Sequence, residues 1–109
     1  MEDGTETRHM IEEIVQKIVA EYAPQKIILF GSHAYGHPDE ESDLDLLVIK
    51  DTDKRPIERW TDLKRTLRDR DRATSVSPIV YTPKELEERL ASGDFFIREV
   101  LEKGEVLYG

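Results

Sequence analysis

The chain has 109 residues, no cysteine and a formal net charge of −8 at pH 7. This length suits one domain spanning residues 1–109 rather than two, and the absence of cysteine excludes disulfides and thiolate metal sites. The acidic balance argues against a broad nucleic-acid-binding surface, so any chemistry on phosphates would need a metal ion or a local basic site. No apolar run is long enough to cross a membrane, and together with the missing cysteine this favours a cytoplasmic location.

The first third of the chain predicts a helix, a strand and a tight turn. From Thr7 to Tyr22 the apolar residues recur at helical spacing, which predicts an amphipathic helix. Residues 26–30, KIILF, predict a short buried strand that ends at Gly31. Ser32 follows as the expected N-cap of a short helix.

The middle of the chain predicts a helix and an edge strand. Apolar residues at helical spacing predict a helix from Pro56 to about Arg70. The basic residues of the stretch 54–72 alternate with acids, which predicts a solvated helix face. Residues 74–82 predict a strand in which Pro78 lacks an N–H group, and this favours an edge position or a bulge.

The last part predicts two short helices and a final extended segment. Thr82 is expected as an N-cap, with Pro83 as the first helical residue and Glu85 completing a capping box. Phe95–Lys103 predicts a further helix, and residues 105–109 an extended end. The whole order predicts an α/β (α+β) domain with a small mixed β-sheet flanked by helices.

Two aspartates stand at the start of the second predicted strand, residues 43–50. Because side chains alternate along a strand, Asp43 and Asp45 share one face with Leu47 and Ile49, while Leu44, Leu46 and Val48 share the other. Two like charges about 4 Å apart repel by about 1 kcal/mol in water and by several-fold more near a protein surface. A divalent cation would offset that repulsion, and paired carboxylates suit Mg²⁺, which also binds substrate phosphates.

The Gly31-Ser32 turn offers the complementary half of a phosphate site. A strand that ends in Gly-Ser and leads into a helix presents backbone N–H groups and a hydroxyl, which can bind phosphate oxygens. Each signal is weak alone, since most such pairs are ordinary loop or strand-end residues. Their combination within one short stretch predicts a site for nucleoside triphosphate chemistry.

The stretch 31–48, GSHAYGHPDEESDLDLLV, resembles the signature of the nucleotidyltransferase superfamily that includes DNA polymerase beta. The whole chain is similar to the minimal nucleotidyltransferases (MNT proteins) of prokaryotes. The resemblance implies the nucleotidyltransferase fold, with Gly31 and Ser32 at the triphosphate and with Asp43 and Asp45 as catalytic Mg²⁺ ligands. It also implies transfer of AMP from ATP to a hydroxyl group, with a HEPN-domain ribonuclease toxin as the partner that this chain counteracts as an antitoxin.

One position departs from that family pattern. A third carboxylate normally stands on the next strand and helps to activate the attacking hydroxyl, and here the corresponding residue is Ser77. Serine cannot act as a carboxylate base, and general base catalysis contributes typically about 10²–10⁴-fold. Asp69, Asp71 and Glu85 flank the strand as possible substitutes, although the sequence does not place them in the site.

Several further side chains have two possible roles. His33 could contact phosphate or base, or be an ordinary loop histidine. Tyr35 could stack on a nucleobase, but packing is the favoured reading, and Trp60 is favoured as a core or interface residue. Phe95 and Phe96 open a helix, so one of them could be exposed at a protein interface, but core packing is the favoured interpretation.

Three functional hypotheses follow. The leading one is a Mg²⁺-dependent adenylyltransferase acting on a partner protein. The second is a weak or inactive enzyme that neutralises a HEPN toxin by binding alone, and the residue that motivates it is Ser77. The third, a nucleic-acid-directed transferase, ranks last because the chain is short and acidic.

Overall fold

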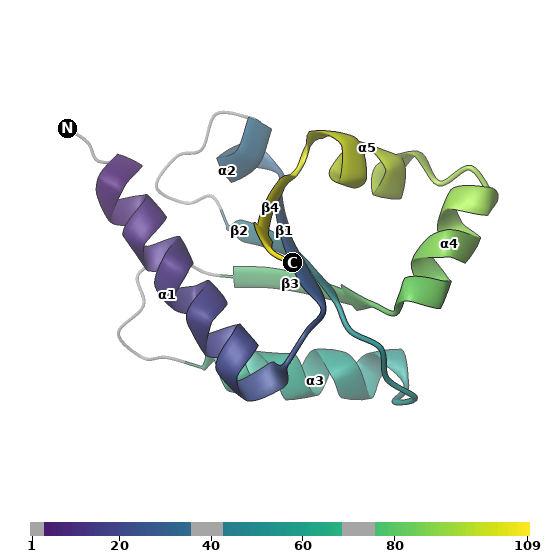
Figure 1. The fold of residues 1–109 in the computed structure, drawn as a ribbon, viewed down its shortest axis with the longest axis horizontal. Helices are drawn as coiled ribbons and strands as arrows, with labels where there is room; N and C mark the ends of the chain where they lie inside the picture. The colour runs from purple at the N-terminus through teal and green to yellow at the C-terminus, as the bar shows by residue number, and fades with distance from the viewer. Residues whose placement is uncertain (1–3, 36–42, 69–75) are drawn as a thin grey trace.

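The computed structural model describes residues 4–35, 43–68 and 76–109, and Figure 1 shows helices on both sides of a central sheet. In chain order the described elements are α1 (Gly4–Tyr22), β1 (Lys26–Phe30), α2 (Ser32–Tyr35), β2 (Leu44–Ile49), α3 (Pro56–Leu67), β3 (Val76–Tyr81), α4 (Pro83–Ala91), α5 (Phe95–Lys103) and β4 (Glu105–Tyr108). This order confirms the predicted α/β organisation.

The described strands form one mixed sheet in the order β3-β2-β1-β4. β1 pairs antiparallel with both β2 and β4, while β2 and β3 run parallel. The parallel pair needs a crossover connection, and α3 supplies it. The final extended segment, predicted without a partner, is the second edge strand of this sheet.

α1 and α3 pack on one face of the sheet, as their apolar stripes predict. Both faces of a partly parallel sheet are commonly covered by helices, so its central strand can be apolar on both sides. The buried cluster on this face includes Ile11, Ile14 and Ile18 of α1, Leu63 and Leu67 of α3, and Leu44, Leu46 and Val48 of β2.

α4 and α5 cover the opposite face of the sheet (Figure 1). The second buried cluster consists of Ile28, Phe30, Leu47, Ile49, Leu86, Ile97 and Val100. The predicted alternation along β2 is therefore confirmed, because its two sets of side chains fall in different clusters. Asp45 belongs by alternation to the face that α5 covers.

Local capping residues explain where two helices begin. Thr82 Oγ1 accepts a hydrogen bond from Glu85 N at 3.1 Å, and Glu85 Oε1 accepts one from Thr82 N at 3.0 Å, which confirms the predicted capping box of α4. The prediction that Ser32 caps α2 is wrong by one position. The Gly31 carbonyl accepts the amide hydrogen bonds of Ala34 and Tyr35, so Gly31 stands at the cap and Ser32 is the first helical residue.

Pro78 lies on an edge strand, as predicted. Tyr81 O accepts from Lys50 N on the inner side of β3, whereas Val80 O faces outward toward Arg59 of α3. Because alternate residues of a strand point their backbone groups to opposite sides, Pro78 lies at an outward position. Its missing N–H group therefore costs the sheet no hydrogen bond.

Arg59 of α3 departs from the predicted solvated face. Its side chain is only 3% exposed and forms a two-point ion pair with Glu85 of α4, with Nη1–Oε1 at 2.7 Å and Nη2–Oε2 at 2.8 Å. Arg59 Nε also donates to Lys54 O at 3.0 Å. This arginine ties α3 to α4 across the edge of β3, and the ion pair lowers the pKa of Glu85 below its ordinary value.

Element boundaries differ modestly from the predicted ones. The first helix begins at Gly4 instead of Thr7, the second strand is Leu44–Ile49 instead of 43–50, and α3 ends at Leu67, with Arg70 outside the described residues. The predicted strand 74–82 corresponds to β3, and residues 74 and 75 also lie outside the described part. Among the described helices, none combines the length and apolar character that crossing a membrane requires.

Candidate active site

Asp45 lies at the centre of the candidate site, at the start of β2. In the sheet it is paired with Phe30, the last residue of β1, and with Ser77 near the start of β3. Directly paired residues place their side chains on the same face with their Cβ atoms about 5 Å apart. Gly31 follows Phe30 directly, so the predicted glycine turn and the predicted aspartate are neighbours in space.

Gly31 makes its close approach to Asp45 possible. Its φ is +77°, a backbone conformation that residues with a side chain rarely adopt. A Cβ atom at this position would collide with Asp45 Oδ2 and would lie 3.1 Å from Asp45 Cγ. The glycine is therefore required both by the turn and by the carboxylate beside it.

Burial and a neighbouring acid both disfavour the charged form of the Asp45 carboxyl. Partial burial raises the pKa of the Asp45 carboxyl above its ordinary value, and the negative charge of Asp43 raises it further. His33 acts in the opposite direction on the pKa of Asp45 without cancelling the other two effects. The arrangement thus holds two adjacent acids at a cost that a bound cation would remove.

Ser77, the position where the family resemblance implies a third carboxylate, lies beside the aspartate pair. It is paired with Asp45 in the sheet, and its Oγ donates a hydrogen bond to Asp43 Oδ2 at 3.2 Å. The hydroxyl thus orients Asp43 but adds no negative charge. Within residues 4–35, 43–68 and 76–109, no group of three or more histidine, aspartate or glutamate side chains is placed to hold a metal ion.

The three acids considered as substitutes for the missing carboxylate have different outcomes. Glu85 does not serve, because its carboxylate is bound by Arg59 and by the amide of Thr82. Asp69 and Asp71 lie outside the described residues. The described part of the site consequently consists of one aspartate pair, one serine and the glycine turn.

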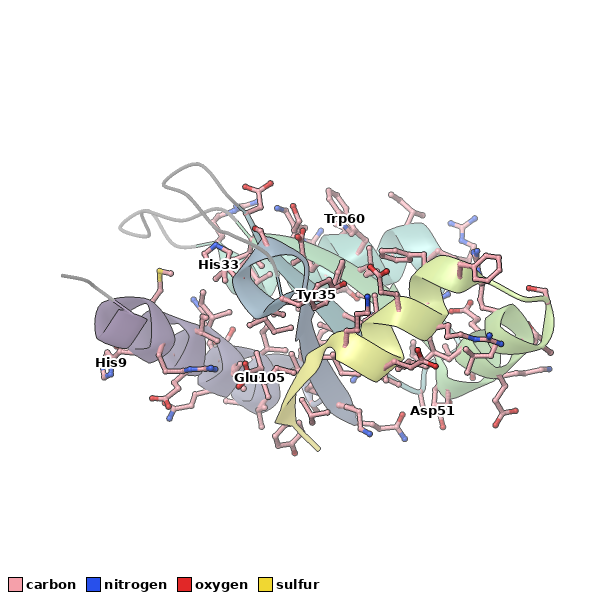
Figure 2. All side chains as sticks on the ribbon, turned by 90° about the horizontal axis from the view of Figure 1, so that it is seen from above. His9, His33, Tyr35, Asp51, Trp60 and Glu105 are labelled. Carbon is pink, nitrogen blue, oxygen red and sulfur yellow. The ribbon has the colours of Figure 1, made fainter. Side chains whose placement is uncertain are left out.

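Three aromatic side chains lie near this end of the sheet. Phe30 and Phe96 of α5 contact each other edge to face, with ring centroids 5.5 Å apart. Tyr35 extends from α2 toward α5, where its hydroxyl lies 3.4 Å from Glu99 Oε2 (Figure 2). Phe95 is 81% exposed and Phe96 49% exposed, so the core packing favoured for these two residues is wrong. Tyr35 is 39% exposed and is therefore only partly packed.

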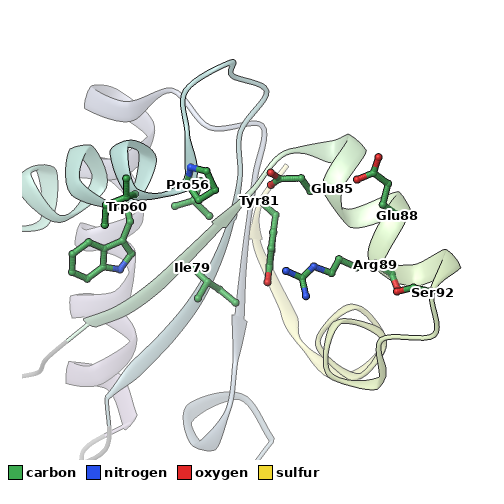
Figure 3. Close-up of a pocket in the computed structure, with 10 residues that line it drawn as sticks. Pro56, Trp60, Ile79, Tyr81, Glu85, Glu88, Arg89 and Ser92 are labelled. Carbon is green, nitrogen blue, oxygen red and sulfur yellow. The ribbon is translucent and has the colours of Figure 1, made fainter.

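A separate depression lies along the outer edge of β3, between α3 and α4 (Figure 3). Its volume is about 890 Å³, and Trp60, Tyr81 and Arg89 are among the residues that line it. Trp60 is partly exposed at this depression rather than in the core. The depression is toward the opposite end of β3 from Ser77, and it contains neither aspartate of the candidate site.

Comparison with known proteins agrees with this geometry. Residues 12–109 match the family model described as "Polymerase beta, Nucleotidyltransferase". The chain belongs to the polymerase beta nucleotidyltransferase family. Nearly the whole chain is covered by the match, including the glycine turn, the aspartate pair and Ser77.

Two relatives refine this assignment. The chain is 35% identical over 101 residues to the protein named "Putative protein adenylyltransferase MJ0604" from Methanocaldococcus jannaschii, covering 90% of this chain and 94% of that protein. A crystal structure described as a "putative nucleotidyltransferase" from Sulfolobus solfataricus is similar with a TM-score of 0.58 and 23% sequence identity, covering 73% of this chain and 70% of that one. The second similarity concerns the fold alone.

Sequence reasoning missed two features, one beside the site and one at the other end of β3. The first is the role of Phe96, whose contact with Phe30 brings α5 to the edge of the aspartate pair. The second is the binding of Glu85 by Arg59, which removes Glu85 from consideration as a catalytic acid. A glutamate already assigned to a capping box is a weak candidate for catalysis, and that signal was present in the sequence.

Proposed function

We propose that this chain is a Mg²⁺-dependent nucleotidyltransferase that transfers AMP from ATP to a hydroxyl group of a partner protein. The observation that carries the proposal is that Gly31, directly after β1, lies against Asp45 of β2, which is paired with Ser77 of β3 and has Asp43 nearby. The family membership and the name of the relative from Methanocaldococcus jannaschii support the same class of reaction.

The donor set fits a magnesium ion. Mg²⁺ prefers oxygen ligands and is typically bound through one or two carboxylates together with substrate phosphates. Asp43 and Asp45 would hold it, and its positive charge would oppose the burial and the Asp43 charge that raise the pKa of Asp45. When bound, the ion would stabilise negative charge on the triphosphate oxygens.

The chain's own residues would mainly position the substrate. The turn at Gly31 and Ser32 would receive the triphosphate, because the first N–H groups of a helix lack partners within that helix. The acceptor oxygen would form a bond to the α-phosphorus as the bond to pyrophosphate breaks, and the hydroxyl proton would pass to solvent or to a base. Ser77 holds Asp43 in place but cannot take that proton, so positioning and charge stabilisation would supply most of the rate.

The partner belongs to the proposal as well. A HEPN-domain toxin is the partner that the resemblance to minimal nucleotidyltransferases implies, with this chain acting as its antitoxin in a hetero-oligomer in the cytoplasm. A direct test incubates the chain with Mg²⁺, α-labelled ATP and a HEPN-domain toxin. Label on the partner is the expected result.

The decisive variant combines Asp43→Asn and Asp45→Asn. We expect it to lose Mg²⁺-dependent ATP binding, measured by calorimetry, and to transfer no label, because both charged ligands are removed while side-chain size is kept. The matched control is Asp51→Asn, an exposed aspartate just after β2, which should bind ATP as the wild type does. Unchanged ATP binding in the double variant would contradict the proposed site.

Ser77 favours a second candidate function, neutralisation of the toxin by binding alone. A serine at the third carboxylate position, bonded to Asp43, is the observation behind it. Under this alternative the double asparagine variant still protects cells that express the toxin. Loss of protection with complex formation intact would contradict it and would favour the transferase.

A further inference from the structure

Phe96 is an exposed aromatic residue beside the aspartate pair. Its ring meets Phe30 at an interplanar angle of 80°, and Phe30 is the residue directly paired with Asp45. Phe96 is nevertheless 49% exposed, so only part of its surface is used by this contact. A large aromatic side chain left half open next to a phosphate site has surface available for a ligand.

Tyr35 stands on the neighbouring element, α2, which begins directly after Gly31. Its hydroxyl lies 3.4 Å from Glu99 Oε2, and Glu99 follows Phe96 by three residues on α5. Residues three apart on a helix lie on the same face. The contacts of Phe96 and of Glu99 thus show that one face of α5 lies against the end of β1 and against α2.

The rings near this end of the sheet differ from two rings that line the separate depression, Trp60 and Tyr81. Lys64 lies 5.6 Å from the ring centre of Trp60, and Arg89 lies 5.2 Å from that of Tyr81. A base that stacked on either ring would have to displace a cation. Among the described residues, no cation lies over Phe96 or Tyr35.

We propose that Phe96, with Tyr35 beside it, forms the subsite for the base of the nucleoside triphosphate. The proposal rests on the proposed function, because the triphosphate must lie at Gly31 and the aspartate pair for the base to reach α5. The occupant is a nucleobase because its flat face matches an open ring, whereas the triphosphate has no apolar surface to offer.

The test compares two ligands that share a triphosphate but differ in the nucleoside. Binding of Mg-ATP and of Mg-tripolyphosphate is measured by calorimetry on the wild type, Phe96→Ala and Phe96→Leu. Stacking on an aromatic ring contributes enough that its loss should weaken ATP binding between about fivefold and about a hundredfold. Tripolyphosphate binding should stay within about twofold of the wild type. Phe96→Leu keeps apolar volume against Phe30, so it reports on stacking even if the alanine variant folds poorly.

Phe95→Ala is the matched control. Phe95 precedes Phe96 on the same helix and is 81% exposed, so its removal should change neither ligand's affinity.

Equal ATP affinity in the wild type and both Phe96 variants would overturn the subsite. Equal weakening of ATP and tripolyphosphate binding would also overturn it, because it would indicate a structural role. A wild-type chain that binds neither ligand would overturn the proposed function itself, and the subsite with it. A wild-type chain that binds tripolyphosphate but gains nothing from the nucleoside would overturn the subsite alone.

Discussion

Replacing Ser77 by aspartate tests the geometry of the site most directly. Ser77 is paired with Asp45 in the sheet and its Oγ lies 3.2 Å from Asp43 Oδ2, so Ser77→Asp would place a third carboxylate beside the two present. Ser77→Asn is the matched control, because asparagine has the same shape and no charge. The difference between the two variants isolates the effect of the added negative charge.

The magnitude follows from the separation of the charges. At about 4 Å two like charges repel by about 1 kcal/mol in water and by about 4 kcal/mol near a protein surface. Asp43 is exposed and Asp45 half-buried, so the lower part of this range applies to Asp43 and the upper part to Asp45. We expect Ser77→Asp to be about 1–3 kcal/mol less stable than Ser77→Asn without a divalent cation. For a small domain this lowers the Tm by about 4 °C or more per kcal/mol.

The assay is thermal unfolding of both variants, first in a chelator and then in millimolar Mg²⁺. A ligand that binds only the folded state stabilises it by RT ln(1 + [L]/Kd), so a site with three carboxylates should gain more from Mg²⁺ than a site with two. We expect Ser77→Asp to have the lower Tm in the chelator and the larger increase on addition of Mg²⁺. The same variant should transfer AMP faster than Ser77→Asn, because the new carboxylate can act as a base.

Two results would refute this reasoning. Equal Tm values for the two variants in the chelator would show that residue 77 does not face the aspartate pair. The absence of any Tm increase with Mg²⁺ in both variants would show that the pair does not bind the ion, whatever the stability in the chelator.

Two further predictions concern the residues that support the site. Gly31→Ala should lose about 1–2 kcal/mol of stability from backbone strain and should also lose Mg-ATP binding, because its Cβ collides with Asp45. The control is Gly93→Ala, at φ +84° with no atom within 4 Å of the added Cβ, which should show the strain alone. Equal ATP binding by the two variants would contradict the collision. Arg59→Met should lose about 2–3 kcal/mol in urea unfolding, because it leaves Glu85 unpaired, whereas Arg55→Met at an exposed ion pair should change stability by less than about 0.5 kcal/mol. Because Arg59 lowers the pKa of Glu85, the stabilisation by the ion pair is present above the ordinary pKa of 4.5 and is lost as the pH falls through the lowered pKa. The unfolding free energies of the wild type and Arg59→Met should therefore become equal in acid. A difference that does not change with pH would contradict the ion pair.

Local patterns predicted most of the elements that carry the site. The alternation along β2 assigns each of its side chains to a face without any knowledge of the fold, since strand periodicity is fixed. The Thr82–Glu85 capping box lies within four consecutive residues, so its start signal is complete in the sequence. The position of Ser77 was predicted by counting along a motif, and the structure pairs this serine with Asp45 in the sheet.

Long-range partners could not be predicted in this way. Arg59 sits among exposed charged residues of the same helix, and only its ion pair with Glu85, 26 residues away, explains its burial. Phe96 likewise looks like any apolar residue at the start of a helix. Its place beside the site depends on how α5 packs on β1, which is a property of the folded chain.

The buried ion pair also bears on catalysis. Glu85 is the one substitute acid that the described residues include, and its carboxylate already binds Arg59 and completes the cap of α4. Recruiting it to the aspartate pair would leave Arg59 buried and unpaired, which is strongly unfavourable. Transfer by the described residues would therefore depend on two carboxylates and on positioning, and a cation that arrives with the triphosphate would offset the burial and the neighbouring acid that raise the pKa of Asp45.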